Sequence, residues 1–379
     1  RRYNIKGASV AITKNENLVY AKGFGNANME TSEEVLPGHL FRIASVSKLI
    51  TAVGIMKLYE QGKLSLDEKV FGQDGILNDE RFAHYKDSRV EEITIKHLLN
   101  HTAGWSRKSG DPMFNSLYIA RKMGDTPPAD VDLIIEYVLS KRLNYSPGTK
   151  YSYSNLGYAI LGKVIEQKTG MAYEDYIVLN VLNPIGILDM HLGRSLYHEK
   201  YPNEVRYYEP AGASKCFAFD GTGRMVSKSY GGNNISLLAA AGGWVASAPE
   251  LAKFISAIDG FDHLKDILKP ETLEMMTNPF EAGKGLYGWR GTDKHGTWWR
   301  TGTLSGSTAL VIRMENGVNW VVLLNTSSFK RTRIHNKLSK TIFAATYRIN
   351  EWPEQNLFVS ETDRKPEPIN SIPSLNPKL

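Results

Sequence analysis

Ser45 and Lys48 lie three residues apart in the sequence Ser45-Val46-Ser47-Lys48, and their side-chain types suit nucleophilic catalysis. On a helix, residues i and i+3 lie on one face within reach of each other. A serine hydroxyl is a poor nucleophile until a base takes its proton, and a lysine can do so when burial and positive neighbours lower its pKa. The spacing therefore predicts that Ser45 forms an acyl-enzyme and that Lys48 handles its proton.

The S-x-x-K spacing is not specific by itself, because Ser327-Ser328-Phe329-Lys330 has the same form. Ser45 is favoured because it directly precedes a long apolar helical pattern, from about residue 46 to 61, that stops at Gly62. A serine in the first turn of such a helix has the positive end of the helix dipole beside a developing oxyanion. The alternative is a structural serine at a helix N-terminus.

A second candidate element is Tyr153-Ser154-Asn155, which precedes a helical pattern over residues 156–168. A tyrosine can act as a general acid or base when nearby cations stabilise its phenolate. Asn155 offers an amide that orients a substrate or, alternatively, caps the helix. Tyr201-Pro202-Asn203 also fits Y-x-N, so spacing alone does not decide between the two.

The third candidate element is Trp299-Arg300-Thr301-Gly302-Thr303, where a strand pattern, small residues and a glycine coincide. A glycine in a strand lets a backbone approach a bound substrate closely. Lys168-Thr169-Gly170 is a literal K-T-G. However, a lysine in the last turn followed by glycine is typical of a helix C-terminus. The triplet that begins at Arg300 is therefore the predicted site element.

Strand and helix patterns indicate how these residues are positioned. Alternating runs at 7–13 and 18–24, separated by Asn15-Glu16-Asn17, predict a hairpin. Strand patterns return at 297–301, 309–314 and 320–325, and the last two are joined by Glu315-Asn316-Gly317, a strong hairpin signal. Helical patterns lie between these ends, near residues 94–100, 130–141, 156–168, 173–182 and 249–258.

The simplest arrangement is an α+β fold in which both chain ends share one antiparallel sheet flanked by helices, with a large, mainly helical region inserted. We expect a discontinuous sheet subdomain formed by residues 1–62 and 285–350 and a helical subdomain formed by residues 63–284. Residues 351–379 are polar and contain prolines, so we expect an extended or loosely attached C-terminal segment.

Composition narrows the functional class. The chain has 379 residues, 42% hydrophobic and 23% charged, which is ordinary for a globular protein, and it has no apolar run long enough to span a membrane. The net charge of +6 is concentrated in residues 330–340, where apolar residues at helical spacing predict an amphipathic helix with a solvated basic face. No nucleic-acid motif accompanies it. The single cysteine, Cys216, excludes an internal disulfide.

The three elements occur in the order used by the serine β-lactamase and penicillin-binding-protein family. Flanking segments add to this resemblance: Phe41 to Ser45 resembles the lead-in to the nucleophile, Leu98 to Gly104 resembles the "LLTHTSG" loop, and Tyr153–Gly162 and Ala241–Trp244 match further family segments. The chain is thus similar to this family from about residue 5 to 347, and most of all to class C β-lactamases, DD-peptidases and related esterases. The resemblance implies a β-lactamase/transpeptidase-like fold.

The resemblance also implies roles. Ser45 would be acylated, Lys48 and Tyr153 would share proton transfer, and Asn155 would contact the acyl side chain of the substrate. The backbone N–H groups of Ser45 and Thr303 would form an oxyanion hole. The chain has no convincing counterpart of the deacylating glutamate of class A enzymes, which favours the tyrosine-type subgroup.

Arg300 departs from the family pattern, which usually has Lys or His at this position. Arginine keeps the positive charge and gains a fork that matches a carboxylate, but it cannot carry a proton. We therefore expect Arg300 either to receive a substrate carboxylate or to support a Tyr153 phenolate. His101 and His295 are interpreted as structural loop histidines. No clustered His, Asp, Glu or Cys spacing suggests a metal, and no cofactor is expected.

The sequence thus predicts a serine hydrolase of peptide-like substrates (D-amino-acid peptides, as for a DD-carboxypeptidase) or of esters. The alternatives are a β-lactamase and a slow-turnover penicillin-binding sensor. The expected partner is a small-molecule or peptide substrate, not a nucleic acid, and specificity is expected in loops around 105–130 and 195–235. Because the chain starts at Arg1 without a signal region, we expect a trimmed or mature form, located in the periplasm, cell envelope or medium, with the cytoplasm as the alternative.

Overall fold

The computed structural model describes residues 3–108, 110–278, 285–329 and 331–358. Its main element is a seven-stranded sheet with the order β3-β2-β1-β12-β11-β10-β9. The N-terminal part of the chain provides β1 (Gly7–Lys14), β2 (Asn17–Asn28) and β3 (Glu33–Glu34). The C-terminal part provides β9 (Gly291–Thr292), β10 (Trp298–Leu304), β11 (Ser307–Arg313) and β12 (Val318–Leu324).

The two ends of the chain meet in the middle of this sheet. β1 and β12 pair antiparallel, from Ala8 opposite Leu324 to Lys14 opposite Val318. The predicted hairpins are both present, and Gly317 in the second adopts the left-handed φ of +77° that such a turn favours. The antiparallel sheet predicted from both chain ends is therefore confirmed.

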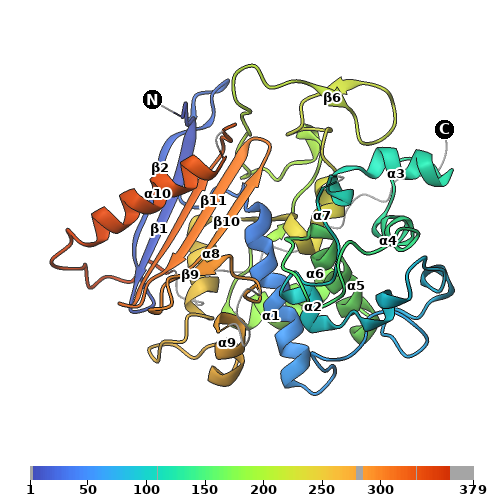
Figure 1. Ribbon diagram of the computed structural model, residues 1–379. Helices are drawn as coiled ribbons and strands as arrows, with labels where there is room; N and C mark the ends of the chain where they lie inside the picture. The colour runs from blue at the N-terminus through green and yellow to red at the C-terminus, as the bar shows by residue number, and fades with distance from the viewer. Residues whose placement is uncertain (1–2, 109, 279–284, 330, 359–379) are drawn as a thin grey trace.

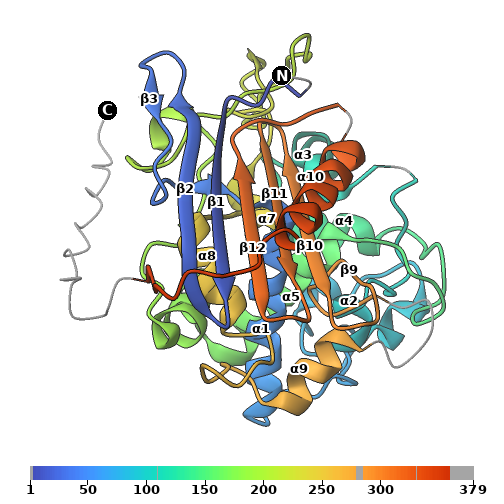
Figure 2. The ribbon, with the colours of Figure 1, turned by 90° about the vertical axis from the view of Figure 1, so that its left-hand side faces the viewer.

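Alternating side chains give the sheet two buried faces. One face packs under α10 (Arg331–Thr346), which crosses in front of the strands in Figure 2. The strand residues of this face include Ile12, Leu310, Ile312, Trp320 and Val322. The opposite face of the sheet packs against the helices of the larger core. Its strand residues include Ala11, Leu18, Ala309, Val311, Val321 and Leu323. A three-layer arrangement follows, since each apolar face needs its own cover.

Helix α1 (Ser47–Glu60) runs through the centre of the molecule, between the sheet and most helices of the middle region (Figure 1). Nearly every residue from Ser47 to Met56 is buried, as the apolar pattern on more than one side predicted. The helix ends at Glu60 with Gln61 as its C-cap, and Gly62 follows with a left-handed φ of +67°. The predicted stop at this glycine is confirmed.

The helices of the middle region include four predicted ones: α2 (Ile95–Leu99), α4 (Val131–Leu139), α5 (Asn155–Thr169) and α8 (Ala248–Ser256). The predicted helix at 173–182 is divided into α6 (Tyr173–Ile177) and a π-helical turn, Val178–Leu182. The sequence pattern missed α3 (Ser116–Met123), α7 (Ile235–Gly242) and α9 (Pro270–Thr277). None of the helices in the described ranges is long and apolar enough to cross a membrane.

Two small sheets complete the fold. β4 (Phe41–Arg42), β8 (Trp244–Ala246) and β5 (His191–Leu192) form one, in the order β4-β8-β5. β6 (Cys216–Phe217) and β7 (Met225–Val226) form a hairpin. Although α8 lies within the region predicted to be the helical subdomain, it packs on β1 and β12 of the main sheet.

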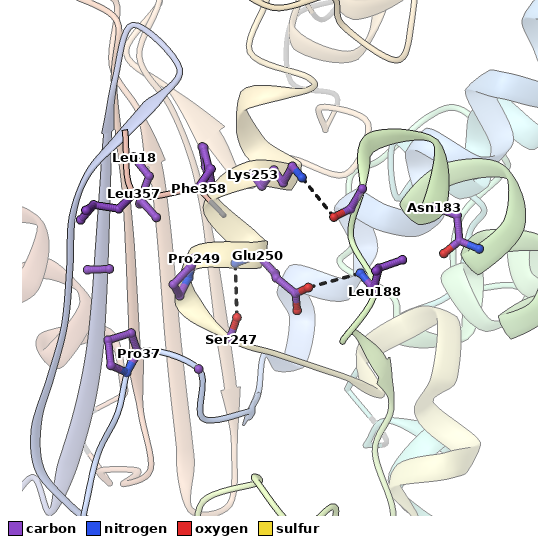
Figure 3. Close-up of a pocket in the computed structure, with 13 residues that line it drawn as sticks. Leu18, Pro37, Asn183, Leu188, Ser247, Pro249, Glu250, Lys253, Leu357 and Phe358 are labelled. Atoms are coloured by element: carbon purple, nitrogen blue, oxygen red, sulfur yellow. Dashed lines mark hydrogen bonds between the residues drawn. The ribbon is translucent and has the colours of Figure 1, made fainter. Parts of the chain in front are cut away.

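A cavity of about 400 Å³ lies between α8 and the edge of the sheet (Figure 3). Leu357, in the C-terminal segment, lines this cavity. Its backbone N–H donates to the Leu18 carbonyl at 2.7 Å. On the other side, Lys253 of α8 donates to the Gly186 carbonyl at 3.0 Å, and Glu250 accepts from the backbone N–H of Leu188 at 3.2 Å. None of the predicted site residues lines this cavity, so it is separate from the candidate active site.

Candidate active site

The predicted nucleophile, Ser45, lies in a 3₁₀ turn, Ala44–Val46, that leads directly into α1. Ala44 has a left-handed φ of +50°, which is uncommon for a residue with a side chain. The turn is held by a hydrogen bond from the backbone N–H of Ile43 to the Trp244 carbonyl, 3.0 Å long. The sequence thus places Ser45 on a tight and fixed turn at a helix N-terminus.

Strand β10 lies directly against this turn because residue 302 is a glycine. A Cβ built on Gly302 would lie 2.2 Å from the Ile43 carbonyl oxygen and 3.1 Å from the Ala44 side chain. From the sequence, this glycine was expected to allow the close approach of a substrate. In the structure its role is the close approach of the strand to the nucleophile turn, which brings Thr301 and Thr303 to the same cavity as Ser45.

Tyr153 forms a hydrogen bond with the predicted nucleophile: its hydroxyl donates to Ser45 Oγ at 2.8 Å. Arg300 Nη2 donates to the same phenol oxygen at 3.1 Å, and the Lys48 ammonium lies 5.0 Å from the ring centroid. Burial by itself would raise the pKa of the Tyr153 hydroxyl, but Lys48 and Arg300 outweigh burial and lower this pKa from 10.0 to about 7. A phenolate at this position can accept a proton near neutral pH.

Lys48 is fully buried on the first turn of α1. Its ammonium donates to Asn155 Oδ1 at 2.7 Å and to the carbonyl oxygen of Ala241. Burial lowers the pKa of Lys48 from 10.5 to about 8, with Tyr153 acting in the opposite direction and Arg300 adding to the decrease. Lys48 therefore holds a positive charge beside Tyr153, and Tyr153 is the residue that contacts the serine hydroxyl.

Asn155 begins helix α5 and is buried. Ser154, and not Asn155, caps this helix: its Oγ accepts from the backbone N–H of Gly157 at 3.0 Å. The Asn155 amide accepts from Lys48 and donates through Nδ2 to Asp111 Oδ2 at 2.7 Å. Both ends of the amide are thus used to position the Lys48 ammonium. Asp111 was missed by the sequence analysis, because an isolated aspartate in a loop carries no motif.

Arg300 joins the nucleophile turn to the tyrosine. Its side chain is 1% exposed, Nε donates to the Ser45 carbonyl at 2.7 Å, and Nη2 donates to Tyr153. Nη1 is buried, and no atom of the described residues forms a hydrogen bond with it. Of the two expected roles for this arginine, the geometry favours support of the phenolate over the capture of a substrate carboxylate.

His101 supports Tyr153 from the other side. The ring centroids of the two residues lie 4.6 Å apart, and His101 Nδ1 accepts from the backbone N–H of Ser154 at 3.3 Å. Burial lowers the pKa of His101 well below 6.5, so the imidazole is neutral. Its backbone carbonyl also accepts from the Ser152 N–H at 2.8 Å. His101 is therefore a structural residue, as expected, and it positions the tyrosine.

A cavity of about 240 Å³ opens over Ser45, and two further arginines lie at its walls. The guanidinium carbons of Arg107 and Arg290 lie 5.6 and 5.9 Å from the Tyr153 ring centroid. Arg107 Nε is 3.8 Å from Asp111 Oδ2, and Arg290 donates to the Tyr151 hydroxyl at 2.8 Å. The mouth of the site is therefore cationic. These arginines were not predicted from the sequence, because loop arginines have no characteristic spacing.

The alternative motif matches lie elsewhere. Lys168-Thr169-Gly170 is the end of α5, with Gly170 at a left-handed φ of +68°, which confirms it as a helix terminus. Tyr201 donates to the Leu192 carbonyl at 3.1 Å and Asn203 to Asp189 at 2.8 Å. Ser327 accepts from the Gly306 N–H, while Lys330 of that motif lies outside the described residues. In the described ranges no three His, Cys, Asp or Glu residues gather as metal ligands.

Comparison with known sequences gives one family. The family model described as Beta-lactamase matches residues 1–341. Protein flp of Staphylococcus aureus (strain MW2) is 28% identical over 203 residues, which cover 52% of this chain and 37% of flp. The chain thus spans well under half the length of this relative.

Comparison with solved structures gives the same fold. An octameric penicillin-binding protein homologue from Pyrococcus abyssi is 27% identical with a TM-score of 0.68, covering 90% of this chain and 74% of that chain. The D-amino acid amidase from Ochrobactrum anthropi SV3 is 22% identical with a TM-score of 0.70, covering 91% of this chain and 95% of that chain. Both likenesses extend over the sheet and the helical region together.

Proposed function

Because the chain belongs to the β-lactamase family, we propose that it is a serine hydrolase that acts through an acyl-enzyme on Ser45. The observation that carries this proposal is the 2.8 Å hydrogen bond between Tyr153 Oη and Ser45 Oγ, with Arg300 on the same phenol oxygen. A nucleophile and its base within hydrogen-bond reach, with a third group holding the base, is the arrangement that nucleophilic catalysis requires.

In the proposed acylation step, the Tyr153 phenolate takes the proton of Ser45 while Oγ attacks the substrate carbonyl carbon. The resulting oxyanion accepts hydrogen bonds from the backbone N–H groups of Ser45 and Thr303. Tyr153 then gives its proton to the leaving amine or alcohol as the C–N or C–O bond breaks. One oxyanion donor is worth about 2.7–4 kcal/mol of transition-state stabilisation in such chemistry.

Deacylation repeats these steps with water. Tyr153 accepts a proton from the water molecule that attacks the acyl carbonyl, and Ser45 leaves with that proton as the second tetrahedral intermediate collapses. The phenolate is available in both steps because Lys48 and Arg300 lower the pKa of Tyr153 to about 7. A base whose pKa is near the working pH combines availability with proton affinity.

The proposed substrates are peptide-like compounds that end in a carboxylate, such as D-amino-acid peptides, together with esters of similar shape. Support comes from the cationic mouth, where Arg290 and Thr301 lie on the β10 side of the cavity. A guanidinium is well suited to bind a carboxylate through two parallel hydrogen bonds. The names of the P. abyssi and O. anthropi proteins, a penicillin-binding protein homologue and a D-amino acid amidase, agree with this class.

The test is intact-mass spectrometry with a fluorophosphonate, a penicillin and a short-chain ester. We expect one adduct in the wild type, none in Ser45→Ala, and an unchanged adduct in Ser327→Ala, the serine of the other S-x-x-K motif. A sustained rate with one reagent names the substrate class, whereas a burst followed by almost no turnover selects a slow-turnover binder. An adduct that persists in Ser45→Ala, or none with any reagent, contradicts the proposal.

A further inference from the structure

A second cavity, of about 290 Å³, lies beside the catalytic one. It is bordered by the loop after Gly104, by the C-terminal half of α4 and by the start of α5. Arg107, Tyr153 and Asn155 line both cavities. The two spaces are therefore neighbours with a common wall that contains the proposed base.

The walls of this second cavity are mainly apolar and aromatic. They include Trp105, Tyr118, Ile119, Tyr137, Val138 and Leu156. The rings of Tyr118 and Tyr137 meet edge to face, with centroids 6.4 Å apart, while Ile119 and Leu156 are buried. Aromatic rings prefer such edge-to-face and offset neighbours, so a further ring is a suitable occupant of these walls.

Trp105 adds a polar feature. Its indole Nε1 is buried and has no hydrogen-bond partner among residues 3–108, 110–278, 285–329 and 331–358, although a buried indole N–H usually finds one. An oxygen atom on a bound ligand would supply the missing acceptor. The Asp111 carboxylate, also at this cavity, already accepts from Asn155 and from the backbone N–H of Met113.

The size suits one aromatic ring and a short linker. A cavity of about 150 Å³ with apolar walls is known to hold benzene, and this one is larger. The common wall includes Arg107, whose side chain is 54% exposed and whose Nε lies 3.8 Å from Asp111 Oδ2. The Asp111 side chain is buried, but its carboxylate keeps the hydrogen bonds from Asn155 and Met113 when the exposed arginine moves aside.

The direction of the substrate follows from the proposed function, on which this inference rests. If the carboxylate of the leaving group lies by Arg290 and Thr301, the acyl part extends the opposite way from the reacting carbonyl. Arg290 and Thr301 do not line the second cavity, while Asn155 does. We infer that the second cavity binds an aromatic side chain of the acyl group, so that the enzyme prefers aryl-bearing acyl donors.

The test compares the p-nitrophenyl esters of phenylacetic and acetic acid, which share one leaving group. In the wild type we expect kcat/KM to be higher for the phenylacetyl ester by on the order of 10–200-fold. Apolar substrate pockets discriminate between substrates by factors of this size. Val138→Phe fills the cavity and should bring this ratio close to one, with the acetyl ester little affected. Val131→Phe is the matched control, because Val131 is a half-buried valine of the same helix that does not line the cavity.

Labelling of Ser45 by a fluorophosphonate separates the two proposals. If neither the fluorophosphonate nor the esters acylate Ser45, the proposed function itself fails. If Ser45 is acylated but the wild-type ratio is near one, or if Val138→Phe leaves the ratio as it was, the inference about the second cavity is overturned. Should Val138→Phe lower the melting temperature markedly, Tyr118→Ala replaces it: Tyr118 is 57% exposed, and its loss should reduce the same ratio in a folded protein.

Discussion

Tyr153 Oη donates to Ser45 Oγ at 2.8 Å, although the two residues are 108 positions apart in the chain. The lysine of the S-x-x-K motif is directed instead at Asn155 and Ala241. The motif therefore contains the proposed nucleophile and an adjacent buried cation, and the proposed base comes from another element. This division of roles leads to the following predictions.

Removal of the Tyr153 hydroxyl should abolish most of the activity. We expect Tyr153→Phe to lower kcat by roughly 10²–10⁴-fold, the usual contribution of a general acid or base. Tyr145→Phe, which changes another partly exposed tyrosine, should leave kcat unchanged. Steady-state kinetics on an ester substrate give both numbers, and a Tyr153→Phe enzyme within twofold of the wild type would exclude the tyrosine as base.

The pH profile should be bell-shaped. Below the Tyr153 pKa of about 7 the phenol is protonated and cannot accept the serine proton, so kcat/KM should rise with pH through this value. Above the Lys48 pKa of about 8 the ammonium loses its charge and no longer supports the phenolate, so kcat/KM should fall again. Ester hydrolysis measured between pH 5 and 10 tests both limbs, and a flat profile over this range would rule out the assignment.

The charge of Arg300 should determine the pH at which kcat/KM rises on the acidic side of the profile. Arg300→Met removes one of the two cations beside the phenol, so the lower limb should move up by about one pH unit or more, which corresponds to ~1.4 kcal/mol of lost interaction. Arg300→Lys keeps the charge and should move the limb less, while the lost bonds to Ser45 and Tyr153 lower kcat. The control is Arg313→Lys, a buried arginine of β11 that lies away from the cavity, and its profile should match the wild type. If Arg300→Lys left both kcat and KM unchanged, a special role for arginine would be untenable.

The glycine at 302 should be needed for both stability and activity. In Gly302→Ala the new Cβ would overlap the Ile43 carbonyl oxygen, so β10 must move away from the nucleophile turn. We expect a loss of about 1–3 kcal/mol of unfolding free energy, typical of overpacking, and slower fluorophosphonate labelling of Ser45. Gly38→Ala is the control, because a Cβ there meets nothing within 4 Å. Equal labelling rates in the two variants would contradict the close-approach argument.

Glu16, Asp259 and Asp266 form an acidic cluster away from the candidate site. This cluster should make the free energy of unfolding decrease as the pH rises. Burial, and then Asp259, raise the pKa of Glu16 from 4.5 to about 8, and burial and Asp259 raise that of Asp266 to about 7. The folded state therefore holds protons that the unfolded chain releases near pH 4.5 from Glu16 and near pH 3.8 from Asp266. The contribution of these groups to the unfolding free energy should be greatest below these values and decrease up to about pH 8. Arg313, whose Nε donates to the Asp259 carbonyl, is the cation of this cluster.

Denaturant unfolding at pH 5 and pH 8 measures this effect. The difference between the two values should shrink in Glu16→Gln, which cannot ionise, and should persist in Glu34→Gln, where the side chain is exposed. An undiminished difference in Glu16→Gln would show that other groups are responsible.

Much of the fold was predictable because its signals are local. The hairpin at Asn316-Gly317 and the buried helix that ends before Gly62 follow from turn chemistry and hydrophobic spacing within a few residues. Helix α7 was missed because its segment, Ile235–Gly242, is interrupted by a non-helical Ala239 and shows no clear period. Likewise, Gly302 was recognised as important, but its contact with Ile43 depends on how a strand meets a turn far away in the sequence.

The site was predictable in part for the same reason. Ser45, Lys48, Tyr153, Asn155 and Arg300 stand in recognisable motifs, and the structure brings all of them together. Asp111, Arg107 and Arg290 are single residues in loops, and their positions depend on tertiary packing that no local pattern encodes. Asp111 accepts a hydrogen bond from the Asn155 amide, and Arg107 and Arg290 make the mouth of the site cationic. Neither contribution could be predicted without the structure.

The pairing of β1 with β12 has a consequence for how the protein is made. Since Ala8 pairs with Leu324, the central ladder of the sheet cannot close until the chain has been translated and released at least as far as residue 324. Ser45, Tyr153 and Arg300 are likewise separated by more than a hundred residues each, so they are translated one after another. Folds with such distant pairings have a high contact order and fold slowly. A nascent chain would thus carry Ser45 well before Arg300 is made, and the proposed chemistry would begin only after β10 and β12 are in place.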